Sequence, residues 1–177
     1  MPTQVAKQAP KGLDKLAAQP WKLRASASRA MRKHLDAQRL VTPHFAWSEF
    51  ASHDPQKTPV PANLRANTIR LCWLLEKMRH ELGDVPMTID SGFRTRDWNR
   101  HVGGAADSRH MHGDAADFFV AQVDRWIAKG TARNRADVLA VANRIFASGG
   151  VGNETTGTLH VDARGWRARF VKWVAAK

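Results

Sequence analysis

Apolar residues recur at helical spacing over residues 62–82, and this segment is the clearest helix that the sequence predicts. Pro61 precedes it and Gly83 follows it, which are positions that these residue types favour at helix ends. The predicted apolar face consists of Leu64, Ile69, Cys72, Trp73, Leu75, Met78 and Leu82. Because Cys72 is the single cysteine and belongs to this face, we expect a buried thiol and no intrachain disulfide.

Weaker patterns predict further helices. A sparse apolar stripe predicts a basic helix over residues 22–40, and the segments 123–130 and 135–150 predict helices that end at glycines. The aromatic-rich segment 45–50 is expected to pack on the core, with Ser48 as a candidate cap of a short helical turn. Near the end of the chain, three aromatic residues lie at roughly helical spacing: Trp166, Phe170 and Trp173.

Three strands are expected from the apolar pattern. Residues 85–90 alternate between apolar and polar types, and residues 115–121 form an apolar run that is typical of a buried strand, anchored by Phe118 and Phe119. The third strand covers residues 158–163. Its odd and even positions point to opposite faces, so His160 and Asp162 share one face, opposite Leu159 and Val161.

The order of the predicted elements indicates an α+β fold. Helix, strand, long loop, strand, helices and strand follow one another, which predicts a small, mostly antiparallel sheet with helices packed against it. The polar segment 91–113 is the long loop, with at most one short helix. Loops of this length inside a compact domain are usually functional.

Charge is distributed unevenly along the 177 residues. Residues 1–40 contain nine Lys or Arg against two Asp, so they carry +7 of the net charge of +12. We therefore divide the chain into a basic N-terminal segment, residues 1–43, disordered at first and then helical, and a compact domain, residues 44–177. The charge predicts attraction to a polyanion, either nucleic acid or an anionic cell envelope. Nucleic acid is less favoured because the basic residues follow no known binding motif.

Titratable residues are dense between positions 108 and 119. His110 and Asp117 lie on either side of a glycine, and a turn there could bring both to one ion. With His160 from the third strand they would form a set of two imidazoles and one carboxylate, which is common at catalytic zinc sites. A histidine near an apolar strand is more often an ordinary core or surface residue, and the spacing alone leaves both interpretations open. His112 and Asp114 are not expected to be ligands.

Three motifs in order resemble a known family. The segments are SRHMHGDAAD, which fits S-x-H-x-x-G-x-A-x-D; LHVDAR, which fits a downstream H-x-D motif; and DSGFRT, which fits S-G-[FY]-R. With their flanking blocks they make residues 44–170 similar to the zinc D-Ala-D-Ala carboxypeptidase family. That group includes L-alanyl-D-glutamate endopeptidases of phage endolysins and Hedgehog domains. The resemblance implies this family's zinc fold and hydrolysis of a peptide bond in peptidoglycan.

The resemblance also implies roles for particular residues. It implies one zinc ion, held by His110, Asp117 and His160. It implies that Arg94 binds the substrate carbonyl or stabilises the oxyanion. On the substrate side we also expect His112, as a residue lining the pocket, and Ser108, which would organise the turn around His110 by hydrogen bonding.

The general base is less clearly indicated. The family often places an acidic or histidine side chain a few residues before the last ligand, but Gly157 occupies the position three residues before His160. Glu154, six residues before it, resembles the Hedgehog arrangement and is the favoured base. Asp162 is the second candidate, and it could instead orient a ligand or Arg94. Glu154 could equally be a solvated turn residue.

The favoured function is a zinc peptidase that cuts the stem or cross-bridge of peptidoglycan, as a phage endolysin or virion-associated lysin. The chain has no run of 18 apolar residues and no apolar signal region at its N-terminus. We therefore expect a monomer that is made in the cytoplasm and acts at the cell wall, with the basic segment binding anionic envelope polymers. The alternative is a non-catalytic, zinc-containing module that binds the cell wall. The motifs do not separate carboxypeptidase from endopeptidase action.

Overall fold

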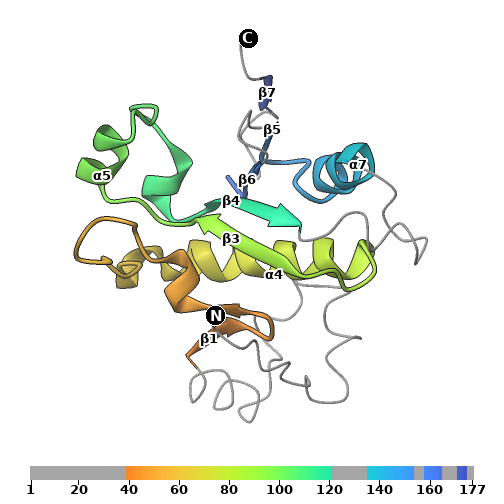
Figure 1. The fold of residues 1–177 in the computed structure, drawn as a ribbon, viewed down its shortest axis with the longest axis horizontal. Coiled ribbons are helices and arrows are strands. Elements are labelled where there is room, and N and C mark those ends of the chain that lie inside the picture. Colours follow the sequence, from red (N-terminus) through yellow and green to blue (C-terminus); the bar gives the residue numbers. More distant parts are fainter. Residues whose placement is uncertain (1–38, 121–134, 154–157, 165–170, 175–177) are drawn as a thin grey trace.

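A computed structural model describes residues 39–120, 135–153, 158–164 and 171–174 (Figure 1). A five-stranded sheet has the order β3-β4-β6-β5-β7. Its strands are β3 (Met87–Ser91), β4 (Ala115–Val120), β5 (Gly150–Asn153), β6 (Leu159–Asp162) and β7 (Val171–Val174). Neighbouring strands are antiparallel except for β5 and β7, which are parallel. The predicted α+β class with a mostly antiparallel sheet is confirmed.

Helix α4 (Arg65–Glu81), preceded by the short helix η2 (Ala62–Leu64), confirms the strongest helix prediction. Its fully buried residues include Leu71, Cys72, Leu75 and Met78. The helix ends as expected at Gly83, whose φ of 86° is accessible to glycine at little cost. Figure 1 shows α4 running along the sheet, and α7 (Arg135–Ile145) packs beside it.

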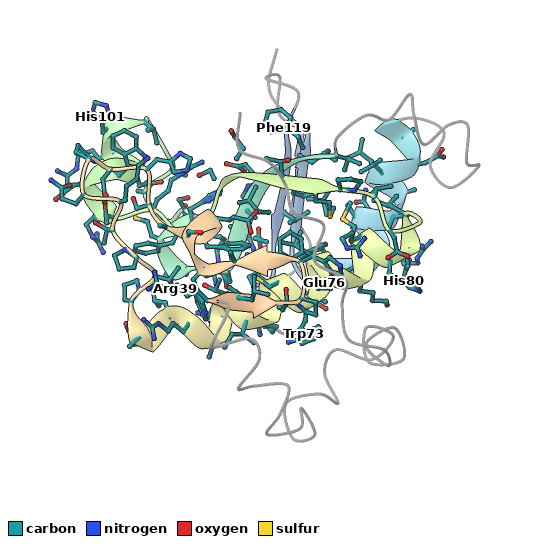
Figure 2. The ribbon with its side chains drawn as sticks, turned by 60° about the horizontal axis from the view of Figure 1, so that its bottom comes forward. Arg39, Trp73, Glu76, His80, His101 and Phe119 are labelled. Carbon is teal, nitrogen blue, oxygen red and sulfur yellow. The ribbon has the colours of Figure 1, made fainter. Side chains whose placement is uncertain are left out.

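The core lies between these helices and one face of the sheet. Phe118 and Val161 point into it from neighbouring strands and are fully buried, as the alternation along β4 and β6 predicts. Phe119 does not anchor the strand in the core as expected, because it is the next residue along β4 and faces the other way. Its side chain is 40% exposed, and Figure 2 shows it on the side of the sheet away from α4.

An N-terminal hairpin covers part of the core. Strands β1 (Leu40–Thr42) and β2 (Phe45–Ala46) pair, and the 3-10 helix η1 (Trp47–Phe50) follows them. Leu40, expected at the end of a helix, lies in β1, and the buried Val41 next to it belongs to the core. Ser48 lies inside η1 and does not cap it. The Glu49 carboxylate instead accepts a hydrogen bond from the Ala46 N–H at 2.6 Å.

Two elements near the C-terminus differ from the prediction. Residues 171–174 form strand β7, whereas the aromatic spacing had indicated a helix. Strand β5 was missed because three of its four residues, in the sequence GVGN, are glycine or asparagine, which are depleted in strands. The helix expected over residues 22–40 lies outside the described residues up to residue 38. The helix expected over residues 123–130 lies outside them entirely, as do Glu154, Gly157, Trp166 and Phe170. Within the described part of the chain, no helix is long and apolar enough to cross a membrane.

The long loop between β3 and β4 contains two short helices, whereas at most one was expected. Helix α5 (Arg96–His101) begins at Thr95, whose hydroxyl accepts a hydrogen bond from the Trp98 N–H at 3.2 Å. The 3-10 helix η3 (Arg109–His112) then leads into β4 and ends at Gly113, which has a φ of 66°. The loop leaves β3 and returns to β4, so it places His110 of η3 next to the strands that carry the other predicted ligands, Asp117 and His160.

Candidate metal centre

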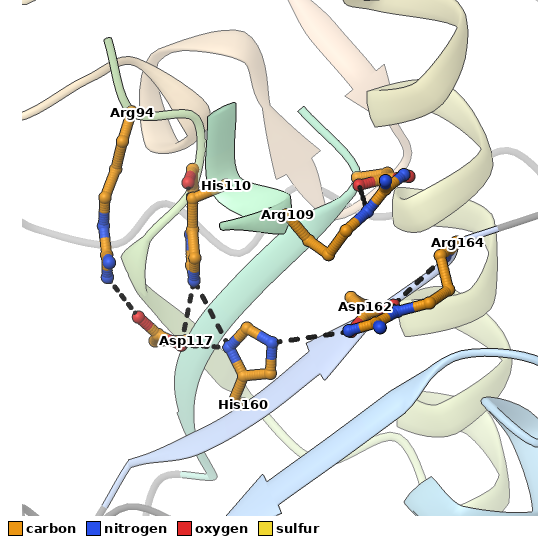
Figure 3. Close-up of polar contacts among 9 residues, drawn as sticks. Arg94, Arg109, His110, Asp117, His160, Asp162 and Arg164 are labelled. Carbon is orange, nitrogen blue, oxygen red and sulfur yellow. Dashed lines mark hydrogen bonds and ion pairs between the residues drawn. The ribbon is translucent and has the colours of Figure 1, made fainter. Parts of the chain in front are cut away.

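Three donor atoms from η3, β4 and β6 converge at one point (Figure 3). Nε2 of His110 lies 3.3 Å from Nδ1 of His160 and 3.3 Å from Oδ1 of Asp117. Nδ1 of His160 lies 2.7 Å from the same Asp117 oxygen. The sheet register sets Asp117 directly opposite His160. In the part of the chain that the structure describes, no other group of three such side chains could hold a metal ion.

The His110 ring is held by the loop after β3. Its Nδ1 donates a hydrogen bond to the carbonyl of Gly92 at 2.6 Å, and the side chain is 3% exposed. A ring that donates from Nδ1 leaves the lone pair of Nε2 facing Asp117 and His160, which is the form that binds metal. The backbone reinforces this pairing, since the Arg94 N–H donates to the carbonyl of His110 at 3.1 Å.

Arg94 fixes the Asp117 carboxylate. Its Nη2 donates to Oδ2 of Asp117 at 2.6 Å, and its Nε donates to the hydroxyl of Ser91 at 2.9 Å. Burial raises the pKa of Asp117, but the adjacent His110 and His160 rings outweigh burial and hold the pKa well below its usual range. Asp117 is therefore ionised, as a metal ligand must be.

His160 lies between two carboxylates. Burial lowers its pKa, but the neighbouring Asp117 and Asp162 carboxylates outweigh burial and raise the pKa to about 9. In the metal-free protein, a protonated His160 thus balances part of the negative charge of Asp117 and Asp162, as a bound cation would. On the far side of the ring, Nε2 lies 3.7 Å from Oδ2 of Asp162.

The donor set fits a zinc ion. A tetrahedral zinc with bonds of about 2.0–2.1 Å to nitrogen and oxygen separates its ligand atoms by about 3.3 Å. Two of the three donor separations have this value, and the third, 2.7 Å, is a hydrogen bond that bound metal would replace. Two imidazoles and one carboxylate supply three ligands, which leaves one position for water or substrate.

A buried ion pair secures the turn that carries His110. Asp114 is 1% exposed, and Nε of Arg109 donates to its Oδ1 at 3.0 Å. The Asp114 carbonyl accepts a hydrogen bond from the N–H of Ala163 at 2.7 Å, just beyond β6. As expected, Asp114 is not among the converging donors. It ties the η3 turn to the strand that carries His160.

Three further residues were predicted to belong to the site: Ser108, His112 and Glu154. Ser108 makes no side-chain capping bond to η3, and its carbonyl accepts a hydrogen bond from the Met111 N–H at 3.1 Å instead. Ser108 thus supports the turn through its backbone, and the predicted role of its hydroxyl stays a prediction. His112 is exposed, and its carbonyl accepts a hydrogen bond from the side chain of Asn67. Its predicted contact with substrate stays a prediction. Glu154 lies outside the described residues.

Sequence reasoning missed the groups that support the ligands. The Gly92 carbonyl, the Ser91 hydroxyl and the Arg164 guanidinium all contact a ligand or its partner. All three lie inside the recognised motifs, DSGFRT and LHVDAR. Motif membership was the available signal, but it does not say which atom each residue contributes.

A family model described as Peptidase M15 matches residues 33–143, which is more than half of the chain. The chain belongs to the peptidase M15 family. The matched range contains Arg94, His110 and Asp117. His160 lies beyond it, so its place in this M15 protein rests on the geometry of β6.

A segment of 56 residues is 52% identical to the zinc D-Ala-D-Ala carboxypeptidase of Streptomyces albus G. This segment is 32% of the present M15 protein and 22% of that relative. The match therefore spans about a fifth of the relative's length. The similarity supports the family assignment and a zinc ion as the metal of the site.

Proposed function

We propose that this protein is a zinc-dependent peptidase that hydrolyses a peptide bond in peptidoglycan. The observation that carries the proposal is the convergence of His110, Asp117 and His160 in an M15 fold, with the donor atoms within 3.3 Å of one another. The name of the Streptomyces relative, a zinc D-Ala-D-Ala carboxypeptidase, supports peptidoglycan as the substrate class.

When bound, zinc supplies Lewis acidity that polarises a scissile carbonyl and acidifies water. Arg94 supplies a second positive charge beside it. Its guanidinium donates through Nε to Ser91 and through Nη2 to Asp117, and the group has five N–H donors in total. The remaining donors can receive a carbonyl oxygen as negative charge develops on it.

Glu154 is the proposed general base. It precedes His160 by six residues, on the segment that joins β5 to β6, and the hydrolysis needs a group that takes a proton from water and passes it to the leaving amine. Glu154→Gln keeps the size of the side chain and removes its basicity. We expect this variant to bind zinc like the unmodified protein and to lose roughly 100-fold or more in kcat.

The cleaved bond and the biological setting are further parts of the proposal. We propose an endolysin or virion-associated lysin, made in the cytoplasm and acting as a monomer at the cell wall. The high positive charge of residues 1–40 supports contact with anionic envelope polymers. Loss of one alanine from stem peptides would show carboxypeptidase action, whereas release of whole stems would show endopeptidase action.

Digestion of purified peptidoglycan, followed by mass spectrometry of the muropeptides, tests the proposal. We expect zinc-loaded protein to release free amino groups, a chelator to abolish the release, and added zinc to restore it. His110→Ala should be inactive under all three conditions. If protein with one bound zinc releases no amino groups from walls of several compositions, the peptidase proposal fails and a non-catalytic module that binds the wall takes its place.

A further inference from the structure

We infer that Asp162, clamped by Arg164, is a positioning residue that holds the His160 ring with Nδ1 facing the other two donors. The inference concerns the second carboxylate of the LHVDAR motif, which could equally have been a general base on sequence grounds. It rests on the metal site of the proposed function, but it does not depend on which bond is cut.

The surroundings of Asp162 leave it little freedom to act as a base. The residue is fully buried. Its Oδ1 accepts hydrogen bonds from Nε of Arg164 at 2.7 Å and from the Arg164 backbone N–H at 3.2 Å, and its Oδ2 accepts from Nη2 at 2.6 Å. A carboxylate held on both oxygens by one guanidinium is fixed in orientation. A general base needs contact with the water that it deprotonates.

The same carboxylate faces the back of a metal ligand. Oδ2 lies 3.7 Å from Nε2 of His160, while Nδ1 of that ring faces Asp117 and His110 (Figure 3). Because the two ring nitrogens lie on opposite sides of the imidazole, a carboxylate beside Nε2 orients the ring so that Nδ1 faces the other two donors.

The neighbouring strand is built to accommodate Asp162. A Cβ atom at Gly149 would lie 1.8 Å from the Asp162 carbonyl oxygen, and one at Gly150 would lie 2.2 Å from Oδ2. Gly150 is also the register partner of Asp162 across β5 and β6. Gly149 thus lets the backbone approach the Asp162 carbonyl, and Gly150 lets it approach the carboxylate, more closely than any side chain would allow.

Asp162 completes a pattern shared by all three donors. The Gly92 carbonyl holds His110, and the Arg94 guanidinium holds Asp117. Asp162 has the same role for His160, and Arg164 in turn holds Asp162. Outer partners of this kind typically contribute 10- to 100-fold to metal affinity.

Metal binding distinguishes positioning from catalysis. We expect Asp162→Ala to lower zinc affinity by roughly 10- to 100-fold in competition with a chelator, and to change the visible absorption spectrum of the cobalt-substituted protein. Asp162→Asn keeps an acceptor oxygen and should lose less affinity than Asp162→Ala. If Asp162→Ala does not fold, Arg164→Lys provides a second variant. It keeps the positive charge but loses the bidentate hydrogen bonding to Asp162, so it should also weaken zinc binding and alter the cobalt spectrum.

Glu76→Ala is the matched control. Glu76 is another buried carboxylate, 5% exposed, and it lies on α4. It is held by His44, from the turn between β1 and β2, and by Arg79, and neither belongs to the metal centre. We expect this variant to lose stability while its zinc affinity and cobalt spectrum stay unchanged.

Two results would overturn the inference. One is an Asp162→Ala protein with normal zinc affinity and cobalt spectrum but a large loss of kcat, since Asp162 would then act in the reaction itself. The other is an equal loss of zinc affinity in Glu76→Ala, which would show a general effect of destabilisation. Failure of the unmodified protein to bind zinc would instead overturn the proposed function.

Discussion

Arg94 contacts the metal centre and still has hydrogen-bond donors to spare. It holds Asp117 through Nη2 and Ser91 through Nε, so its guanidinium has a fixed direction. A pre-oriented cation of this kind costs no reorganisation when charge develops on a substrate oxygen. At the scale of single residues, two hydrogen bonds thus fix the direction in which the Arg94 guanidinium can bind a substrate.

Replacing Arg94 by alanine should affect the reaction more than the metal. We expect Arg94→Ala to lower kcat by roughly 100- to 1000-fold, the usual loss for a group that stabilises an oxyanion. With zinc in excess, so that a weaker grip on Asp117 does not empty the site, zinc content measured by atomic absorption should remain close to one ion per chain. Arg96→Ala is the control, because Arg96 is a nearby but exposed arginine and should be dispensable. Equal losses in both variants would contradict the role of Arg94.

The raised pKa of His160 predicts how the stability of the metal-free protein depends on pH. The folded pKa of about 9 lies above the ordinary value of 6.5, so protonation stabilises the fold. This contribution is complete below about pH 6.5 and is lost as the pH rises through 9. The midpoint of thermal unfolding should therefore fall over this range.

Two comparisons isolate the His160 contribution. In zinc-loaded protein the metal takes the place of the proton, so the fall with pH should be absent. In metal-free His160→Gln it should be absent as well, because glutamine does not titrate. A metal-free protein whose unfolding midpoint is flat from pH 6.5 to 9.5 would show that the pKa of His160 is not raised.

At the scale of elements, the η3 turn and the strand register bring the ligands together. Gly113 ends η3 in the left-handed region, which lets the chain turn from His110 into β4. The antiparallel register then sets Asp117 opposite His160. A shift of one residue in this register would send either side chain into the core face.

Gly113→Ala should therefore reduce both stability and zinc binding. The left-handed conformation costs a residue with a Cβ about 1–2 kcal/mol, and that Cβ would lie 3.1 Å from the Thr68 hydroxyl. Gly103→Ala is the matched control, since its φ of 71° carries the same strain but a Cβ there has no atom within 4 Å. Denaturant unfolding should show a loss in both, whereas only Gly113→Ala should bind zinc more weakly. Equal zinc affinity in the two variants would count against the turn as a positioning element.

At the scale of the whole molecule, charge and catalysis are separable. Residues 1–38 contain eight Lys or Arg and two Asp, half of the net charge of +12. The metal centre and the helices that support it lie after them in the sequence. Attraction of a basic segment to anionic polymers acts over about one Debye length and weakens with salt.

Deletion of residues 1–38 tests this separation. We expect the shortened protein to hydrolyse small soluble muropeptides with unchanged kcat, because the described core and ligands begin later. Its sedimentation with intact cell walls should be weaker at low salt and similar to that of the full chain at high salt. Wall binding that is unaffected by the deletion at low salt would contradict the role of the basic segment.

The sequence by itself determined the α+β class, helix α4, strands β3, β4 and β6, and the three residues expected to bind metal. Apolar periodicity reports which face of an element is buried, and ordered motifs report a shared site. The sequence left β5, β7 and the exposure of Phe119 undetermined. Strand β5 consists mostly of glycine and asparagine, the aromatic spacing that includes β7 also fits a helix, and the outer ends of strands carry little local signal.

Only the tertiary structure decided which atoms face one another. The motif LHVDAR names His160, Asp162 and Arg164, but burial, the close approach of Gly149 and Gly150, and the Arg164 clamp separate a ligand from the residue that supports it. The physical reason is that ligand geometry depends on distances across strands and turns far apart in sequence. Periodicity fixes the face on which a side chain lies, and packing fixes its partners.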